Sequence, residues 1–362
     1  MKRRLLLQSA LPPPSGGIAT WTTNLLASSL ADRWDIRVVN VNAGTLDVSP
    51  RELALRKVGI AARAMAQFSA EIARFQPHVV HMCTSAQTMG LLRDAPLLRL
   101  ARASGAATVL HVHGSASRIG ARPELLPLMR RVLAPADAIV VLNQDSLAHA
   151  LSYGLLNVHR IPNSIATRPL PTRDWPVQGR PVRFLFVGWM MPAKGIFELL
   201  DAFATVPDAE LTMLGRWVAD KQGVVREPEV RERIARPDLA GRVHLPGEVP
   251  LERVWDFYDQ ADVFVLPSWT EGFPMTLLEA MMSGLPAVVS RVGAMPEAVD
   301  DDVNGFVHTP KDTDDLARAL RRIVDDKQRI AEWGAASRER VMARYTHEVV
   351  YEELERLWEG LM

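Results

Sequence analysis

The chain of 362 residues has little cysteine and no long hydrophobic run. Its single cysteine, Cys83, excludes a disulfide within the chain and favours a reducing compartment, so we expect a cytoplasmic protein. No apolar run reaches the roughly 18 residues that a membrane-spanning helix needs. The basic and apolar start of the chain is followed at once by Pro12, Pro13 and Pro14. This order favours a first β-strand over a signal peptide.

The formal net charge is zero at pH 7, but the two halves of the chain differ in charge. Residues 1–180 hold 21 Lys and Arg against 10 Asp and Glu, whereas residues 181–362 hold 21 against 32. This asymmetry and the length of the chain both predict two domains. A basic first half suits an anionic surface or acceptor, and mutual attraction of the two halves is the alternative. The basic half lacks interleaved aromatic residues, so we expect no nucleic-acid partner.

Both halves alternate short apolar segments with amphipathic ones, which is typical of βαβ units in a parallel sheet. The predicted strands are 4–8, 36–40, 79–83, 108–113, 138–142 and 158–161 in the first half, and 182–187, 210–214, 243–245, 263–267, 287–290 and 305–308 in the second. We therefore expect an α/β protein with two doubly wound domains, 1–165 and 182–346, joined by a Pro-rich linker at 166–181. Because ligands bind at the carboxyl ends of such strands, we expect the domains to face a central cleft.

The segment after the predicted strand 263–267 carries two carboxylates around the start of a helix. Pro274 suits the first position of that helix, whose amino end favours a phosphate group. Glu271 and Glu279 would repel a lone phosphate, but they suit hydroxyl groups on either side of a diphosphate. The alternative for Glu271 is a partner for the helix dipole, and for Glu279 a place on a solvated helix face.

This segment, SWTEGFPMTLLEA at residues 268–280, resembles the signature of the family 4 glycosyltransferases, which have the GT-B fold. The resemblance continues through residues 284–290, 292–297 and 304–307, and upstream through 186–195. It covers most of residues 182–345 and is thinner in the first half. It implies two Rossmann-like domains, with a final helix at 347–362 that packs on the first. It also implies retaining, metal-independent transfer of a sugar from a nucleotide-diphosphate sugar to a hydroxyl acceptor, as in polysaccharide biosynthesis.

The resemblance implies a role for each matching residue. Three are implied as catalytic: Lys194 on the diphosphate, Glu271 on the donor-sugar hydroxyls and His113 beside the transferred sugar. Glu279 would bind the ribose. The expected donor-binding set also includes Gly16, Gly17, Trp189, Arg216, Gly272, Phe273, Pro274, Met275 and Thr276. Many members of the family have an arginine where this chain has Trp189, and Arg216 after the next strand is the candidate to replace its charge.

Polar residues follow two strands of the first half. His111 and His113 lie on one face of a predicted strand, but the sequence shows no third ligand at a telling spacing, so we expect no zinc site. His111 is predicted to be a core histidine. Asn143 and Asp145 are candidates for acceptor contact, and Asp145 is the predicted helix cap.

Two basic segments leave a membrane role open. Residues 50–75 and 125–133 combine Lys and Arg with apolar residues, which is typical of helices that lie on an anionic membrane. Such contact would suit a lipid-linked acceptor at the inner face of the membrane; core-packed helices with a charged outer face are the alternative. Two other functions also remain: a nucleotide-sugar epimerase or hydrolase on the same fold, and a non-catalytic nucleotide-sugar-binding subunit.

Overall fold

The computed structural model describes residues 2–12, 16–40, 50–85, 88–114, 126–173, 179–220 and 222–362. The chain divides into two compact units. The first comprises Met1–Ala166 and His347–Met362, and the second comprises Thr167–Thr346. The last helix of the chain therefore belongs to the first unit.

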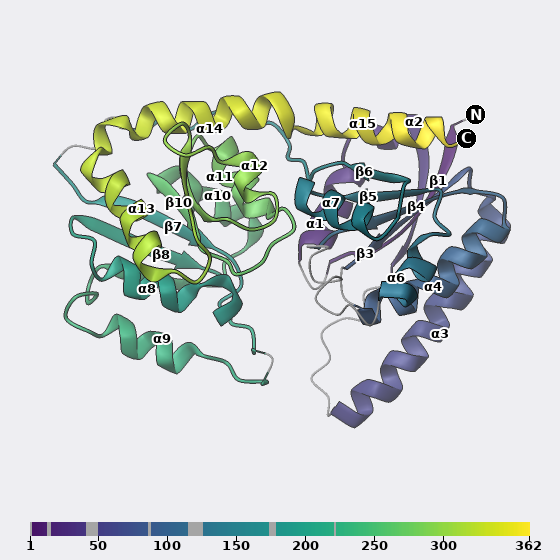
Figure 1. Ribbon diagram of the computed structural model, residues 1–362, viewed down its shortest axis with the longest axis horizontal. Helices are drawn as coiled ribbons and strands as arrows, with labels where there is room; N and C mark the ends of the chain where they lie inside the picture. Colours follow the sequence, from purple (N-terminus) through teal and green to yellow (C-terminus); the bar gives the residue numbers. More distant parts are fainter. Residues whose placement is uncertain are drawn as a thin grey trace. The chain divides into compact units, whose positions relative to one another are not determined.

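The first unit is built on a six-stranded parallel sheet with the order β2-β1-β3-β4-β5-β6. The strands are β1 (Arg3–Ser9), β2 (Trp34–Asn40), β3 (Val79–Thr84), β4 (Ala107–Val112), β5 (Ala138–Val141) and β6 (Val158–Arg160). The helices are α1 (Gly17–Leu26), α2 (Leu30–Arg33), α3 (Pro50–Phe75), α4 (Thr88–Ala103), α6 (Leu126–Leu133), α7 (Gln144–Ser152) and α15 (His347–Gly360). Helices α3 and α4 cover one face of the sheet, and α1 and α15 cover the other (Figure 1). The order of the strands reverses between β1 and β3.

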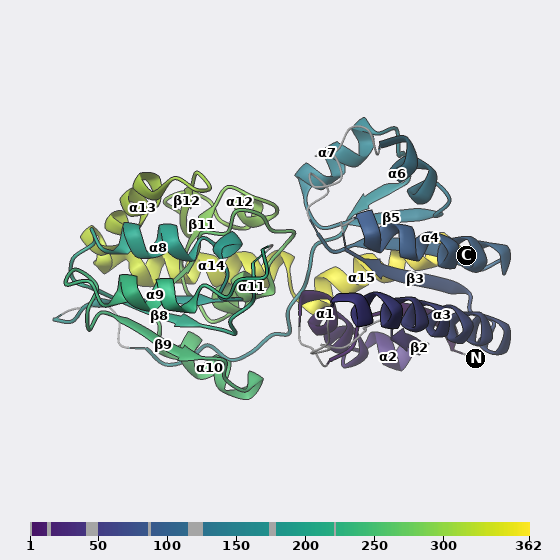
Figure 2. The same ribbon diagram turned by 90° about the horizontal axis from the view of Figure 1, so that it is seen from below.

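The second unit repeats this plan with the order β12-β11-β10-β7-β8-β9. Its strands are β7 (Val182–Val187), β8 (Ala209–Leu214), β9 (Val243–Gly247), β10 (Val263–Leu266), β11 (Ala287–Ser290) and β12 (Gly305–His308). Its helices are η2 (Pro192–Lys194), α8 (Ile196–Phe203), α9 (Glu227–Ile234), α10 (Leu251–Gln260), α11 (Met275–Met282), α12 (Met295–Ala298), α13 (Thr313–Asp325), η3 (Lys327–Arg329) and α14 (Ile330–Arg344). Helix α8 packs beside α13, and α11 packs beside α14 (Figures 1 and 2). The order reverses between β7 and β10, and ligands bind at the carboxyl ends of strands at such a point.

These two sheets confirm the predicted doubly wound architecture. Residues 167–173 of the predicted linker at 166–181 belong to the second unit, and two arginines there bind other segments of that unit. The Arg168 guanidinium donates to both carboxylate oxygens of Asp259, at 2.9 and 2.7 Å. Arg173 donates to the backbone oxygens of Tyr258 and Ser283, each at 2.7 Å. A proline-rich composition indicates irregular backbone, but it cannot show that the arginine side chains attach that backbone to a neighbouring surface.

The helix α3 bears on the predicted membrane contact. Phe68, Ile72 and Phe75 are buried in the core of the first unit, as the core-packed alternative requires. The basic residues at 51–57 and the apolar residues before residue 63 lie outside the side chains that the structure describes. Among the described residues, no helix combines the length and the apolar character of a membrane span.

Candidate active site

A lysine and a glutamate meet at the point where the strand order of the second sheet reverses. Lys194 ends the short helix after β7, and Glu271 lies in the loop after β10. The ammonium of Lys194 donates to Oε1 of Glu271 at 2.5 Å, and both side chains are mostly buried. Two of the residues implied as catalytic are thus in contact. The pair places a cation and an acceptor for hydroxyl groups side by side.

Glycine holds these two loops together. Gly195, directly after Lys194, has φ +72°, which favours glycine. A Cβ there would lie 2.1 Å from the backbone oxygen of Pro267, so another residue would force the loops apart. The amide of Trp269 also donates to the oxygen of Ala193 at 2.9 Å. The loop containing Glu271 is therefore held against the loop containing Lys194 by close backbone contact.

Helix α11 begins beside this pair. Pro274 is the N-cap, with φ −70° and ψ 128°, and Met275 is the first helical residue. Pro274 therefore lies one position earlier than the sequence predicts, because its backbone is still extended. The first-turn amides, Met275 and Thr276 among them, have no acceptor within the helix, which suits an anion. Phe273 and Met275 are themselves buried, so the backbone of this turn rather than its side chains could meet a ligand.

A neighbouring loop supports the segment 271–273 from behind. The amide of Ala294 donates to the oxygen of Gly272 at 2.8 Å. Gly293 has φ +57°, and a Cβ there would lie 2.4 Å from the oxygen of Glu271. This close approach explains why the motif continues through Val292-Gly-Ala.

The carboxylate of Glu279 is held by a tyrosine that sequence reasoning missed. The buried hydroxyl of Tyr258, from α10, donates to Oε2 of Glu279 at 2.7 Å. Burial raises the pKa of Glu279, and the hydrogen bond from Tyr258 partly offsets that shift. Tyr258 is 21 residues from Glu279, and no sequence pattern links a tyrosine on one helix to a glutamate on another.

Trp189 and Arg216 lie on adjacent loops after β7 and β8. The amide of Met190 donates to the oxygen of Arg216 at 2.8 Å, and Met190 forms a β-bridge with Trp217. The Trp189 side chain is 49% exposed, and the Arg216 side chain is also exposed. These backbone contacts bring Arg216 close to Trp189. That proximity is required if the charge of Arg216 is to replace that of the arginine that is absent at position 189.

In the first unit, the predicted glycines begin a helix at the reversal between β1 and β3. Gly16 is the N-cap of α1, with an extended backbone, and Gly17 is its first residue. Among the residues that the structure describes, a Cβ at either position would meet nothing within 4 Å. The two predicted glycines therefore lie at a helix start where the sheet order of the first unit reverses.

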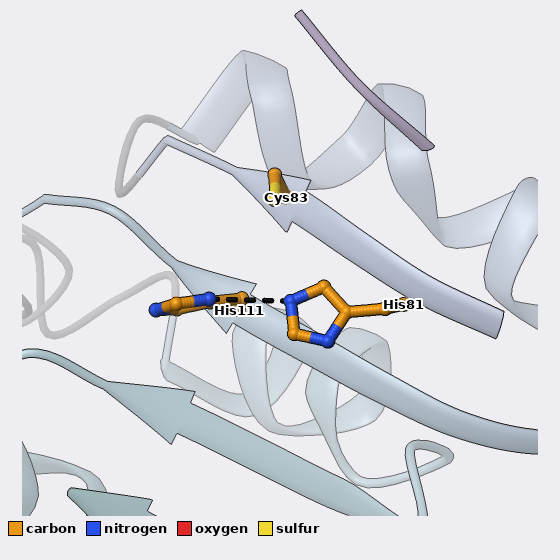
Figure 3. Close-up of side chains that lie close together, drawn as sticks. All are labelled: His81, Cys83 and His111. Atoms are coloured by element: carbon orange, nitrogen blue, oxygen red, sulfur yellow. Dashed lines mark hydrogen bonds between the residues drawn. The ribbon is translucent and has the colours of Figure 1, made fainter. Parts of the chain in front are cut away.

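Histidines cluster at the carboxyl end of β4. Nδ1 of His111 lies 3.2 Å from Nε2 of His81, on the neighbouring strand β3 (Figure 3). The indole N–H of Trp358, from α15, donates to Nδ1 of His81 at 3.1 Å. The rings of His111 and His113 lie 3.9 Å apart between centroids. Burial lowers the pKa of His81 and of His113 to about 3, so both are neutral at pH 7.

His81, Cys83 and His111 form a group of potential metal ligands within the described residues (Figure 3). The sequence showed no third ligand because β3 and β4 bring these residues together across the sheet. An indole N–H can only donate, so Nδ1 of His81 accepts and its proton is on Nε2, which leaves no lone pair there for a metal. Burial also raises the pKa of the Cys83 thiol to about 12. In this arrangement the group is a neutral hydrogen-bonded cluster.

The candidate acceptor residues Asn143 and Asp145 lie at the start of α7. The side-chain oxygen of Asn143 accepts from the amide of Ser146 at 2.8 Å, so Asn143 is the cap and the predicted capping by Asp145 is wrong. A capping residue typically has an extended backbone, and Asn143 has one. Asp145 instead lies one residue inside the helix, half exposed, with its carboxylate 3.2 Å from Nδ1 of His149.

Comparison with known proteins gives matches along both units. The family model "Glycosyl transferases group 1" matches residues 172–340, and "Glycosyl transferase 4-like domain" matches residues 16–164. D-inositol 3-phosphate glycosyltransferase of Corynebacterium kroppenstedtii is 28% identical over 318 residues, 82% of this chain and 70% of the relative. The amylovoran biosynthesis glycosyltransferase AmsK of Erwinia amylovora is 29% identical over half of this chain and 46% of its own.

Solved structures with this fold include sucrose-phosphate synthase of Thermosynechococcus elongatus. It has a TM-score of 0.82 and 22% identity, over 99% of both chains. HepE of Anabaena in complex with UDP-glucose has a TM-score of 0.74 and 18% identity, again over 99% of both chains. At these identities the likeness establishes the fold.

Proposed function

Because this chain belongs to glycosyltransferase family 4 and has the GT-B fold, we propose that it is a retaining hexosyltransferase. In this proposal it moves a sugar from a nucleotide-diphosphate sugar to a hydroxyl acceptor. The observation that carries the proposal is the contact between Lys194 and Glu271, next to the amino end of α11. UDP-sugars are the first donors to test, since HepE was solved with UDP-glucose.

Lys194 and Glu271 have different roles in the proposed binding of the donor. When the sugar–phosphate bond breaks, the diphosphate gains negative charge, and a fixed cation in a partly buried site stabilises that charge. Lys194 is the proposed cation. Glu271 would accept hydrogen bonds from the donor-sugar hydroxyls, and its pairing with Lys194 offsets its repulsion of the phosphates. Glu279, held by Tyr258, would accept from the ribose hydroxyls.

The proposed route has no covalent enzyme intermediate. The acceptor oxygen attacks the anomeric carbon from the side on which the diphosphate leaves, and a donor phosphate oxygen takes the acceptor's proton. We propose that Lys194 and the amides of α11 provide the charge stabilisation without a metal ion. His113, Gly16, Gly17 and Arg216 keep their predicted donor-side roles.

The acceptor class and the location follow as further parts of the proposal. Among the relatives is a protein named for amylovoran biosynthesis, which supports an acceptor in polysaccharide or glycoconjugate assembly. A cytoplasmic location fits a chain with one buried, protonated thiol. If the acceptor is lipid-linked, basic side chains of the first unit would have to make the membrane contact, because Phe68 and its apolar neighbours are buried.

Sugar transfer measured with single substitutions tests the proposal. The donor is first identified from the thermal stabilisation by UDP, GDP, ADP and dTDP and their sugars. Lys194→Ala and Glu271→Ala should each lower kcat by about 10²–10³, the loss typical of a removed transition-state contact. Lys327→Ala and Glu227→Ala are matched controls, because each breaks an ion pair elsewhere in the second unit. Transfer at the wild-type rate in both site variants would refute the roles assigned here.

Two further measurements separate the alternatives. Release of free sugar at full rate without an acceptor would indicate a hydrolase, and donor binding without turnover by any acceptor would indicate a binding subunit. Activity that is lost in EDTA and regained with Mg²⁺ or Mn²⁺ would contradict the metal-independent part of the proposal.

A further inference from the structure

The histidine cluster of the first unit contains buried polar atoms that hydrogen bonding within the protein does not satisfy. Nε2 of His111 and Nε2 of His113 are both buried, and neither has a partner among the described residues. Most buried polar atoms in proteins are hydrogen-bonded, so each exception calls for an explanation. Both atoms belong to rings at the carboxyl end of β4, where ligands of doubly wound sheets bind.

The protonation of this cluster is determined by a residue at its far end. The Trp358 indole N–H can only donate, so Nδ1 of His81 accepts and His81 carries its proton on Nε2. Nε2 of His81 then donates to Nδ1 of His111 across 3.2 Å. His111, also neutral, must carry its own proton on Nε2, the atom that has no partner. The hydrogen bonds are therefore all donated in the same direction, from Trp358 to His81 and from His81 to His111.

We propose that Trp358 and His81 are positioning residues that hold His111 in the Nε2–H tautomer, so that His111 presents a fixed N–H donor beside His113 to a substrate hydroxyl. This inference rests on the proposed function for the identity of the ligand, but not for the tautomers. It assigns α15 a part in the site: besides covering the sheet, the helix supplies the donor that orients the chain of hydrogen bonds.

Charge and packing favour a neutral ligand. Burial lowers the pKa of all three histidines, so the cluster has no positive charge near pH 7 to attract a phosphate or carboxylate. A hydroxyl can accept from Nε2–H of His111 and also hydrogen-bond to Nε2 of His113. Trp21 contacts the three imidazole rings, with centroids 5.0–5.5 Å away, and limits their rotation.

The test replaces the donor and keeps the aromatic ring. Trp358→Phe removes the indole N–H, and Trp34→Phe is the matched control. Trp34 packs edge-on against Trp358 at 5.2 Å and donates its N–H to Glu355 of the same helix at 2.8 Å. Both substitutions therefore remove one indole donor at the contact between α15 and the sheet, but only Trp358 donates to a histidine.

The first readout is the tautomeric state of the histidines, from long-range ¹H–¹⁵N spectra of labelled full-length protein, which needs no donor sugar. In the wild type, His81 and His111 should each show a protonated Nε2 and an unprotonated Nδ1. Trp358→Phe should shift both histidines toward a mixture of tautomers, whereas Trp34→Phe should leave them unchanged. Unchanged histidine signals in Trp358→Phe would overturn the inference.

The second readout is kinetic. Trp358→Phe should lower kcat/KM about tenfold, the effect of one neutral hydrogen bond, and Trp34→Phe should not. Equal losses of kcat/KM in both variants would indicate that Trp358 has only a structural role and would overturn the inference. One zinc ion per chain, lost in Cys83→Ser, would also overturn it, because a metal cannot share Nε2 of His81 with a proton. If the tautomers shift as expected but the wild type transfers no sugar, the proposed function fails and the tautomer assignment stands.

Discussion

Acidification should destabilise the first unit through His81. This side chain is fully buried and neutral, with a pKa lowered from 6.5 to about 3. Between these two values the unfolded chain binds a proton at this position and the native protein does not, so stability falls as the pH falls. From pH 7.5 to pH 5, this one group should lower the free energy of unfolding by about 2 kcal/mol.

The assay is differential scanning calorimetry at both pH values, comparing the wild type with His81→Gln. Glutamine can accept from Trp358 and donate to His111, but it does not titrate in this range. The other histidines with lowered pKa values are His111, His113, His308 and His347, and burial, the main cause of each shift, is common to both proteins. The difference between the two therefore isolates His81. The reasoning is refuted if the glutamine variant loses as much stability on acidification as the wild type.

Two predictions concern the second unit. The hydrogen bond from Tyr258 lowers the pKa of Glu279, whereas burial raises it. Tyr258→Phe should therefore raise this pKa and move the loss of donor affinity on acidification to higher pH, as measured by donor Kd against pH. An unchanged pH dependence would argue that the Glu279 carboxylate does not bind the ribose. Gly195→Ala should lower the stability of this unit by more than about 2 kcal/mol, since a Cβ at φ +72° adds backbone strain to a clash with the next loop. Gly16→Ala is the control by thermal unfolding, because Gly16 has an extended backbone and a Cβ there would contact none of the described residues. An equal loss of stability in Gly16→Ala would refute the steric argument.

The alternation of apolar segments was enough to predict most of the strands. Strands β7, β11 and β12 have the predicted bounds, and nearly all of their residues are buried. Where polar side chains compete with the backbone, the prediction was less accurate. The helical pattern of the sequence runs from residue 17 to residue 30, but α1 ends at Leu26. The Ser28 hydroxyl there donates to the oxygen of Leu25 and accepts from the amide of Leu30.

The motif residues could be named from the sequence, but their partners could not. Lys194 and Glu271 were both predicted, and they lie 77 residues apart; the reversal of strand order between β7 and β10 brings them into contact. His81 and Trp358 were not predicted, because no local pattern sets them apart from other core residues. Local propensity and motif spacing thus determined the elements and the candidate residues. Which of these residues are hydrogen-bonded to one another was decided by the parallel register of β3 against β4 and by the packing of α15. Hydrogen bonds depend on distances that only the folded chain defines.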